Sequence, residues 1–346
     1  MDHFLNGQAF GSVAQRLLMN GMNPSALRPW LGDDNLPYIT NAAGIAVPTM
    51  NATLRKDEWK QFDEVLLRIK QERLVGVDDL TSRGLVYNIS NGLGTTVLEY
   101  EDMSDITGAQ FSMDGATRGQ HDRQEFDINY LPLPIAHKDF HFNIRQLESS
   151  RRLGAPLDTS MMEASVRKVR EAIETLLFVG TGGITYGGGT IYGYMNHPDR
   201  NTGSFTDSNN WDDSSTSGED ILYDVRAMKQ ALINDGFYGP YALYIPTNFE
   251  TKLDDDFKAA SDKTIRQRIM EVKGIELVEV ADKLTADNVV MVSLTSDVVR
   301  LVQGMPITPV EWTTEGGFVF QYKVMTIQVP QIRADQDGNC GIAHWT

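Results

Sequence analysis

The chain has 346 residues, of which 41% are hydrophobic and 23% charged, a composition typical of a globular protein and not of a disordered or fibrous one. Its 31 Lys and Arg against 47 Asp and Glu leave a formal charge of −16. This balance argues against wholesale binding of nucleic acid or of an anionic membrane, because both need net cationic contacts. The single cysteine, Cys340, excludes internal disulfides and multi-cysteine metal sites and fits a reducing cytoplasm. No apolar run approaches the roughly 18 residues of a membrane span.

The first 50 or so residues are predicted to form an arm, because prolines interrupt any helix of useful length. These prolines are Pro24, Pro29, Pro37 and Pro48. Residues 54–74 follow and carry apolar side chains at helical spacing, which predicts one amphipathic helix with a narrow buried stripe. The stripe consists of Trp59, Phe62, Leu66 and Ile69.

Residues 85–144 are predicted to contain strands, because apolar and other residues alternate in three stretches. The alternating residues are Leu85, Tyr87 and Ile89, then Phe126, Ile128 and Tyr130, then Phe140, Phe142 and Ile144. Residues 99–123 are polar, contain glycine and offer few side chains for a core. The simplest arrangement is a long two-stranded hairpin with an exposed tip. An isolated hairpin of that length is marginally stable in water, so we expect it to lie on something else.

The strongest predicted helix begins near Ser160, which makes a capping-box pair with Glu163, and Gly180 is a suitable end. About 20 residues at 1.5 Å each make a rod roughly 30 Å long. Its apolar stripe consists of Met162, Val166, Val169, Ile173, Leu176 and Leu177. The following residues, 180–217, are rich in Gly, Asn, Ser, Thr and Asp and are predicted to form a long, mostly surface loop.

Residues 217–304 are predicted to form a compact α/β segment. Its first helix ends near Gly236 and its second, around residues 264–272, ends at Gly274. One face of the first helix is apolar, with Ile221, Val225, Met228 and Leu232. The expected strands are Tyr241–Ile245, Ile275–Val280, Val289–Leu294 and Val298–Val302. The tail returns to β structure, with a turn at Gly316-Gly317 that joins Val310–Thr313 to Phe318–Val329.

Two of the six histidines, His137 and His141, lie close together in the sequence. On a helix this spacing could hold zinc, with Asp139 between them. Pro132 and Pro134 come before them, however, and the alternation of the neighbouring apolar residues predicts a strand. On a strand the two histidines share a face about 13 Å apart, which is too far for one metal ion.

No other motif predicts chemistry. The glycines at 180–183 and 187–189 do not match a nucleotide-binding pattern and follow a helix instead of a strand. Residues 335–339 imitate the start of a calcium loop but lack the closing glutamate, so a turn is expected. Cys340 has no activating partner nearby in sequence and is expected to be buried or inert. We therefore predict no catalytic, cofactor-binding or metal-binding residue, and no cofactor.

Four stretches of the chain resemble a known family by their order. They are Asp57-Glu58-Trp59-Lys60 through Arg73, Leu131-Pro132-Leu133-Pro134-Ile135 with Lys138-Asp139-Phe140, Leu157 through Gly180, and Tyr238 through Ile245. In the shell proteins of the HK97 fold, such stretches are the early helix, the strand that returns from the extended E-loop, the spine helix and a strand of the axial domain. That family comprises the major capsid proteins of tailed phages and the related bacterial encapsulins.

The resemblance implies an α+β fold with an N-terminal arm, an extended E-loop hairpin, a peripheral domain with a long spine helix, and an axial α/β domain. The implied segments are the arm at 1–53, the peripheral domain at 54–83, 131–217 and 305–346 with the spine helix at about 158–180, the E-loop at 84–130, and the axial domain at 218–304. In this family the axial domains cluster around five- and six-fold axes, and the E-loop lies over the adjacent subunit.

Two departures from the family pattern carry expectations. Some members weld their shells through an E-loop lysine, but this chain has no lysine between Lys70 and Lys138. We therefore expect a shell held non-covalently by arm overlap, augmented strands and surface packing. Some phage members also carry a large N-terminal scaffolding segment that a protease removes. Only about 53 residues precede the first predicted helix here, so we expect no such processing and a separate scaffolding protein.

The function implied by the resemblance is structural, with no enzymatic activity. The chain would assemble with itself through pentamers and hexamers into an icosahedral phage capsid, in the cytoplasm of the bacterial host, and reside in the virion. Portal and scaffolding proteins are expected partners, with a decoration protein as a further candidate and no membrane. The shell would enclose double-stranded DNA without sequence-specific binding. Five basic residues are candidates for lining the lumen: Arg151, Arg152, Arg167, Lys168 and Arg170. A solvated helix face explains the group at 167–170 equally well.

Two other functions remain open. An encapsulin-type compartment would enclose a cargo enzyme, although the proline-punctuated arm before residue 54 favours the phage branch. Neighbouring genes would separate the two, since a cargo enzyme marks one and portal and terminase proteins the other. A soluble enzyme with an unrecognised site would instead show a pocket that gathers titratable groups of perturbed pKa. That alternative leaves the hairpin and the arm unexplained.

Overall fold

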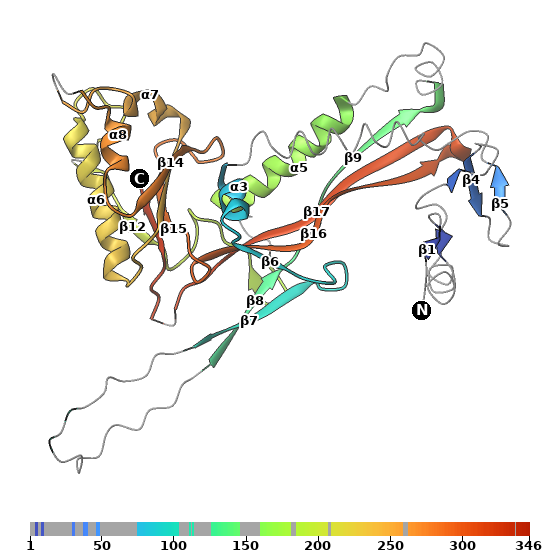
Figure 1. Ribbon diagram of the computed structural model, residues 1–346, viewed down its shortest axis with the longest axis horizontal. Helices are drawn as coiled ribbons and strands as arrows, with labels where there is room; N and C mark the ends of the chain where they lie inside the picture. Colours follow the sequence, from blue (N-terminus) through green and yellow to red (C-terminus); the bar gives the residue numbers. More distant parts are fainter. Residues whose placement is uncertain are drawn as a thin grey trace. The chain divides into compact units, whose positions relative to one another are not determined.

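A computed structural model of the chain describes residues 75–103, 111, 113, 126–145, 160–180, 185–206, 209–258, 262–335 and 337–346, together with short strands in the first 48 residues (Figure 1). The predicted helix at 54–74 lies outside the described residues. The chain divides into two compact units. The first comprises residues 1–73, 137–169 and 307–326, and the second residues 74–136, 170–306 and 327–346.

The predicted arm contains two small groups of antiparallel strands. Strand β1 pairs with β2, and β4 pairs with both β3 and β5. Their bounds are Phe4–Leu5 for β1, Gln8–Ala9 for β2, Trp30–Leu31 for β3, Pro37–Thr40 for β4 and Ala46–Pro48 for β5. The remainder of the arm lies outside the described residues.

The described part of the first unit is built on aromatic packing between strands. In β9 (Ala136–Asn143), the side chains of Phe140 and Phe142 are buried, and the ring of Phe140 stacks on that of Tyr322 with centroids 5.1 Å apart. His137 and His141 are exposed on the same strand. The prediction of a strand is thus confirmed here, and its period of two separates the aromatic face from the histidine face.

The tail strands are longer than predicted. The expected strands Val298–Val302 and Val310–Thr313 are parts of one strand, β16 (Val299–Thr314), followed by a turn at Glu315–Gly317 and by β17 (Val319–Ile332). These strands lie in a four-stranded sheet of order β6-β16-β17-β9. The sequence predicted a break in the strand between residues 302 and 310, and this is wrong because β16 is continuous there. Its neighbour β6 (Val86–Asn88) pairs with it only at residues 301–303. Beyond that point, the prolines of β16 need no N–H on the β6 side.

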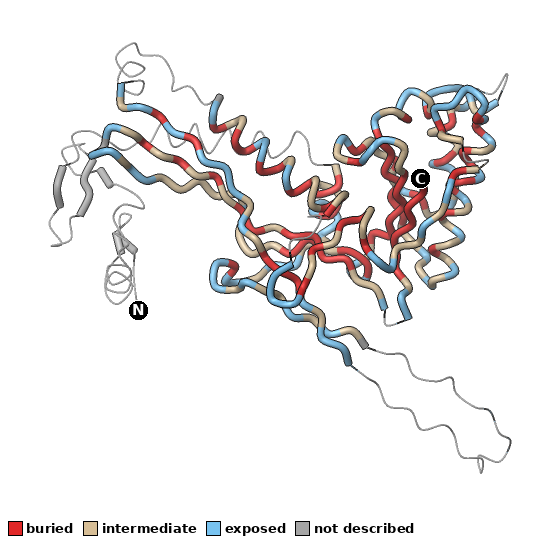
Figure 2. The backbone as a smooth tube through the Cα atoms, turned by 180° about the vertical axis from the view of Figure 1, so that it is seen from behind, coloured by how far each residue is buried: buried red, intermediate tan, exposed pale blue. Residues whose placement is uncertain are grey.

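The core of the second unit is a five-stranded sheet of order β12-β18-β15-β13-β14. Every residue of its strands β13 and β15 is buried (Figure 2). Strand β13 pairs in parallel with β14 and antiparallel with β15, while β18 pairs antiparallel with β15 and parallel with β12. The bounds are Asn201–Gly203 for β12, Tyr241–Ile245 for β13, Ile275–Val280 for β14, Val289–Ser293 for β15 and Ile342–Trp345 for β18.

The helices of this unit follow the sequence prediction. Helix α6 (Gly218–Asn234) begins with a capping box between Ser217 and Asp220, and its predicted apolar face is buried in the core. Helix α8 (Ile265–Met270) is capped by Thr264 in the same way. A 3-10 turn at Thr247–Phe249 and the short α7 (Glu250–Leu253) connect β13 to this region.

The prediction of a mostly surface loop at residues 180–217 is wrong in part. The segment contains β10 (Thr185–Tyr186), β11 (Gly189–Thr190) and β12, and several of its side chains are fully buried: Ile191, Tyr194 and Trp211. The polar residues that suggested a loop instead serve internal hydrogen bonds. The indole N–H of Trp211 donates to Asp224 of α6 at 2.9 Å, and the amide of Thr206 donates to the same carboxylate at 3.0 Å.

A hairpin is present as predicted, but its first strand is not the predicted one: residues 86–88 form β6 and pair with β16, and the first strand of the hairpin lies further along the chain. Strand β7 (Val97–Met103) pairs antiparallel with β8 (Phe126–Pro132), in a register that places Val97 opposite Pro132 and Met103 opposite Phe126. Helix α3 (Val75–Ser82) precedes it in the chain. The predicted long helix is α5 (Ser160–Phe178), and Gly180 follows it with φ of 76°, the left-handed conformation of a helix end.

The predicted domain boundaries remain a prediction, but one sheet draws on segments from both sides of them. Strands β13, β14 and β15 come from the predicted axial segment 218–304, whereas β12 and β18 come from segments assigned to the peripheral domain. Hydrogen bonds between β15 and β18 join these segments along Val289–Val292.

Candidate assembly surface

The outer face of the hairpin exposes apolar side chains. In β8, Phe126 and Ile128 are each 55% exposed and Tyr130 is 37% exposed. The register places Glu101 opposite Ile128 and Glu99 opposite Tyr130. Cross-strand partners share a face, so the outer face combines an apolar row on β8 with carboxylates on β7. We call Phe126, Ile128 and Tyr130 the hairpin row. The sequence predicted these residues as half-buried, and in the single chain they are more exposed than that.

The inner face of the hairpin is attached to the second unit by hydrophobic contacts. Leu98 and Tyr100 of β7 pack, together with Leu131 of β8, against a buried cluster that includes Val302 and Ile327. Burial raises the pKa of the Tyr100 phenol above its usual 10.0. The expectation that the hairpin lies on something else is therefore met at its base, within the chain itself.

Arg333 fixes the base of the hairpin, and Arg300 contacts the neighbouring strands β6 and β17. The Arg333 guanidinium lies 3.6 Å from the Asp102 carboxylate and donates to the carbonyl of Glu101 at 3.4 Å. Arg300 lies over the ring of Tyr87, 4.5 Å from its centroid, and donates to Gln331 at 2.6 Å. Partial burial lowers the pKa of Arg300. Sequence reasoning missed both arginines, because they lie about 200 residues after the strands that they hold.

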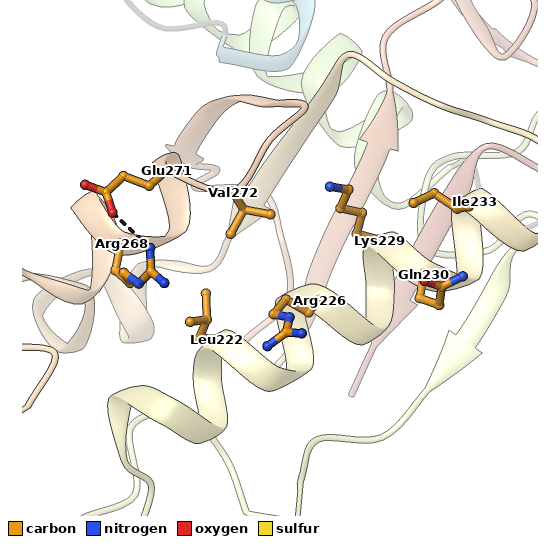
Figure 3. A pocket seen from close by; sticks show the side chains of 8 residues that line it. All are labelled: Leu222, Arg226, Lys229, Gln230, Ile233, Arg268, Glu271 and Val272. Atoms are coloured by element: carbon orange, nitrogen blue, oxygen red, sulfur yellow. Dashed lines mark hydrogen bonds and ion pairs between the residues drawn. The ribbon is translucent and has the colours of Figure 1, made fainter.

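A shallow groove of about 310 Å³ lies between α6 and α8 (Figure 3). Its lining combines apolar residues with three cations: Leu222, Arg226, Lys229, Gln230, Ile233, Arg268, Glu271 and Val272. Arg268 donates to Glu271 at 2.9 Å, and Lys263 bonds the same carboxylate. These bonds lower the pKa of Glu271. The groove holds cations and amides but gathers no nucleophile with an adjacent base, so it does not make a catalytic arrangement.

The residues examined for metal binding remain apart. Within the described part of the chain, no group of three or more His, Cys, Asp or Glu side chains could hold a metal ion. The backbone N–H of Gly338 donates to the carbonyl of Asp335 at 3.1 Å, and the Asp335 carboxylate accepts from the backbone N–H of Asn339 at 2.7 Å. That carboxylate therefore stabilises the local chain fold through a hydrogen bond to the backbone.

Burial keeps the thiol of Cys340 and the imidazole of His344 uncharged at neutral pH. Burial raises the pKa of the Cys340 thiol to about 12, so the reactive thiolate is scarce at neutral pH. Burial, with Arg200 nearby, lowers the pKa of His344 to about 4. Its Nδ1 accepts from Arg200 at 3.2 Å, so Nε2 carries the proton and donates to Asn288 at 2.7 Å. The expectation of a buried Cys340 is confirmed.

The candidate lumen residues differ in how far their side chains are exposed. Arg167 and Lys168 are exposed on α5, whereas Arg170 is 3% exposed and its guanidinium lies 3.8 Å from Asp78 of α3. Arg170 therefore serves an internal contact and is not a lining residue of the single chain. Arg151 and Arg152 lie outside the described residues.

Comparison with known proteins identifies the family. The model of a family of unknown function, DUF6260, matches residues 41–345. The chain belongs to this family. It is also 23% identical over 238 residues to the type 1 encapsulin shell protein EncA of Myxococcus xanthus. The matched residues cover 68% of this chain and 71% of that protein.

Two solved structures show the fold. The virus-like particle protein of Pyrococcus furiosus superposes with a TM-score of 0.60 at 18% identity, covering 83% of this chain and 99% of that one. The capsid of Myoviridae phage XM1 gives a TM-score of 0.59 at 13% identity, covering 77% of this chain and 91% of that one. The chain has the HK97 fold of phage capsids and encapsulin-like shells. In the described residues, no helix combines the length and the apolar character needed to cross a bilayer.

Proposed function

We propose that this chain is the major capsid protein of a tailed phage, which assembles with itself through hexamers and pentamers into an icosahedral shell around double-stranded DNA. The hairpin row is the observation that carries the self-association. An apolar row on an exposed strand face, anchored at its base by Arg333, is stabilised when a second molecule covers it. The HK97 fold supports a shell as the form of that assembly.

The shell has a structural role and works by geometry, so we assign it no catalytic residue. Its subunits hold together without covalent bonds, because the E-loop segment contains no lysine. The arm at 1–53, the E-loop at 84–130 and the spine helix make the contacts between subunits. The axial domain at 218–304 lies at the centre of each capsomer. Portal and scaffolding proteins are the proposed partners, and the virion, assembled in the host cytoplasm, is the proposed location.

An encapsulin-type compartment is the second candidate, and the sequence match to EncA favours it. The two proposals differ in what the shell encloses. A phage shell carries nuclease-protected DNA and no companion enzyme, whereas a compartment retains a cargo protein at a fixed ratio to the shell protein. The proline-punctuated segment before residue 54 supports the phage branch.

Negative-stain electron microscopy of the chain expressed alone tests the shell itself. We expect hollow particles, or rings of five and six subunits, at neutral pH and high concentration. A uniform small oligomer without rings or curvature contradicts the proposal. Particles purified from the native source then separate the two candidates: nuclease-protected DNA supports the capsid, and a stoichiometric protein cargo overturns it in favour of the compartment.

A further inference from the structure

One buried and one half-buried carboxyl group lie near the contact between α3 and α5. Glu174 of α5 is 5% exposed, and one of its oxygens accepts from the backbone N–H of Gly76, at the start of α3, at 3.3 Å. The other oxygen is buried without a hydrogen-bond partner. Asp79 of the same helix accepts from the hydroxyl of Tyr244 at 2.8 Å. Asp79 thus links α3 to β13, and although only half-buried it lies close enough to Glu174 to raise the pKa of that buried acid.

The contact is tight because residue 76 is glycine. A Cβ added at Gly76 would lie 2.7 Å from the Leu177 side chain and 3.0 Å from Phe178. Only the absence of a side chain lets the first turn of α3 approach α5 closely enough for its N–H groups to reach Glu174. The carboxyl group thus occupies the capping position of a neighbouring helix.

The surroundings of Glu174 and Asp79 favour neutral acids. The rings of Phe178, Tyr194 and Tyr244 pack edge to face or stacked, with centroids 5.2 to 6.1 Å apart, and exclude water. This burial raises the pKa of Glu174 to about 7 and that of Asp79 to about 6. Hydrogen bonds from Gly76 and Tyr244 oppose the rise but do not cancel it.

The charged neighbours act in both directions. Asp78 raises the pKa of both acids, Glu279 of β14 raises that of Asp79, and Arg83 lowers it. Arg83 is itself engaged with Glu276 at 2.7 Å. The titratable and charged groups that face the pair are Asp78, Arg83, Arg170, Tyr194, Tyr244 and Glu279.

We propose that the contact between α3 and α5 is a pH-sensitive latch, in which protonated Glu174 holds α3 against α5 and the ionisation of Glu174, beside Asp79, releases it. Ionisation places a negative charge in the buried contact, so separation of the helices, which admits water, becomes favourable. Helix α3 continues through Gly84 into β6 and then into the hairpin. The latch therefore controls the root of the segment that carries the hairpin row.

Hydrogen–deuterium exchange of the full chain at pH 5.5 and pH 7.5, corrected for the intrinsic dependence of amide exchange on pH, tests the latch. Linkage through Glu174 alone predicts an increase of roughly twentyfold in the opening of α3 over this range, because the usual pKa of an open glutamate is near 4.5. Helix α6 is the internal control. Its capping acid, Asp220, has a lowered pKa and stays ionised throughout, so α6 protection should not change.

The double variant Glu174→Gln, Asp79→Asn keeps the shape of the neutral acids and removes their titration. We expect α3 in this variant to stay protected at both pH values. Unchanged α3 protection in the natural chain overturns the latch, and so does an equal pH dependence in the double variant. If the variant fails to fold, the comparison of α3 with α6 in the natural chain still decides. None of these outcomes depends on whether the chain forms a shell.

Discussion

Replacing apolar residues of the hairpin row by threonine should block assembly and leave the subunit folded. Phe126→Thr and Ile128→Thr put a β-branched residue with high strand propensity at each position, so pairing with β7 is retained. Phe126 and Ile128 are each about half exposed in the single chain. An aromatic side chain offers roughly 200 Å² in total, so about 100 Å² of Phe126 remains to be covered by a second subunit.

At about 25 cal/mol per Å², that area contributes about 2.5 kcal/mol, and the exposed half of Ile128 adds about 1 kcal/mol. The double variant should therefore lose about 3 kcal/mol per subunit contact, which raises the threshold concentration for assembly roughly a hundredfold. Because both side chains face solvent in the subunit, the free energy of unfolding should change by less than about 0.5 kcal/mol each.

Light scattering against protein concentration measures the threshold, and urea denaturation of the dissociated subunit measures folding. The matched control is Phe126→Leu with Ile128→Val, which keeps the surface apolar and should assemble close to the natural threshold. The reasoning fails if the threonine variant assembles normally, or if the control is impaired as strongly. A large loss of subunit stability in the threonine variant would place the two side chains in the core of the subunit instead.

Three further predictions concern the second unit. Asp224→Ala leaves the buried donors of Trp211 and Thr206 without an acceptor and should cost about 3–5 kcal/mol in urea denaturation, whereas a cost below about 1 kcal/mol would mean that the loop is not held by this carboxylate. For His344, the folded-state pKa of about 4 lies below the usual 6.5, so its contribution is complete above pH 6.5 and is lost as pH falls toward 4. His344→Gln should flatten that part of the stability profile, and an unchanged slope would contradict the assignment. Cys340, with its pKa raised to about 12, should react with a thiol reagent at pH 8 only after unfolding, and rapid labelling of the native chain would refute its burial.

The sequence predicted those helices and strands whose caps, turns and apolar spacing all lie within a short stretch of chain. The capping box of Ser217 and Asp220 starts α6 where the apolar spacing begins, and strand β14 has the predicted bounds. Gly180 and Gly236, both with positive φ, follow the ends of α5 and α6 as expected, whereas α8 ends at Met270, before the predicted stop at Gly274. These succeeded because caps, turns and periodicity act within one or two turns of chain. The order of such stretches also resembled the HK97 family, which the fold comparison supports.

The candidate surface was predictable only in part. Alternation in β8 identified the apolar row, but not which side would remain open, since both faces of a hairpin are available until one meets a core. Arg333 could not be assigned to the hairpin, nor Arg300 to β6, because a charged residue at a strand end gives no sign of its partner far away in sequence. The loop at 180–217 was misjudged for the same reason, since its polar residues find acceptors on α6.

The sequence by itself determined α5, α6, α8 and most strands, because each is written in local spacing and composition, but it indicated neither α3 nor the first strand of the hairpin. Only the tertiary structure decided which strands share a sheet, as β18 at the C-terminal end of the chain lies between β12 and β15. It also decided that Glu174 is buried and Asp79 half-buried close to the rings of Tyr194 and Tyr244. A carboxylate in a sequence is expected at the surface, and only burial by distant residues turns two of them into groups that titrate near neutrality.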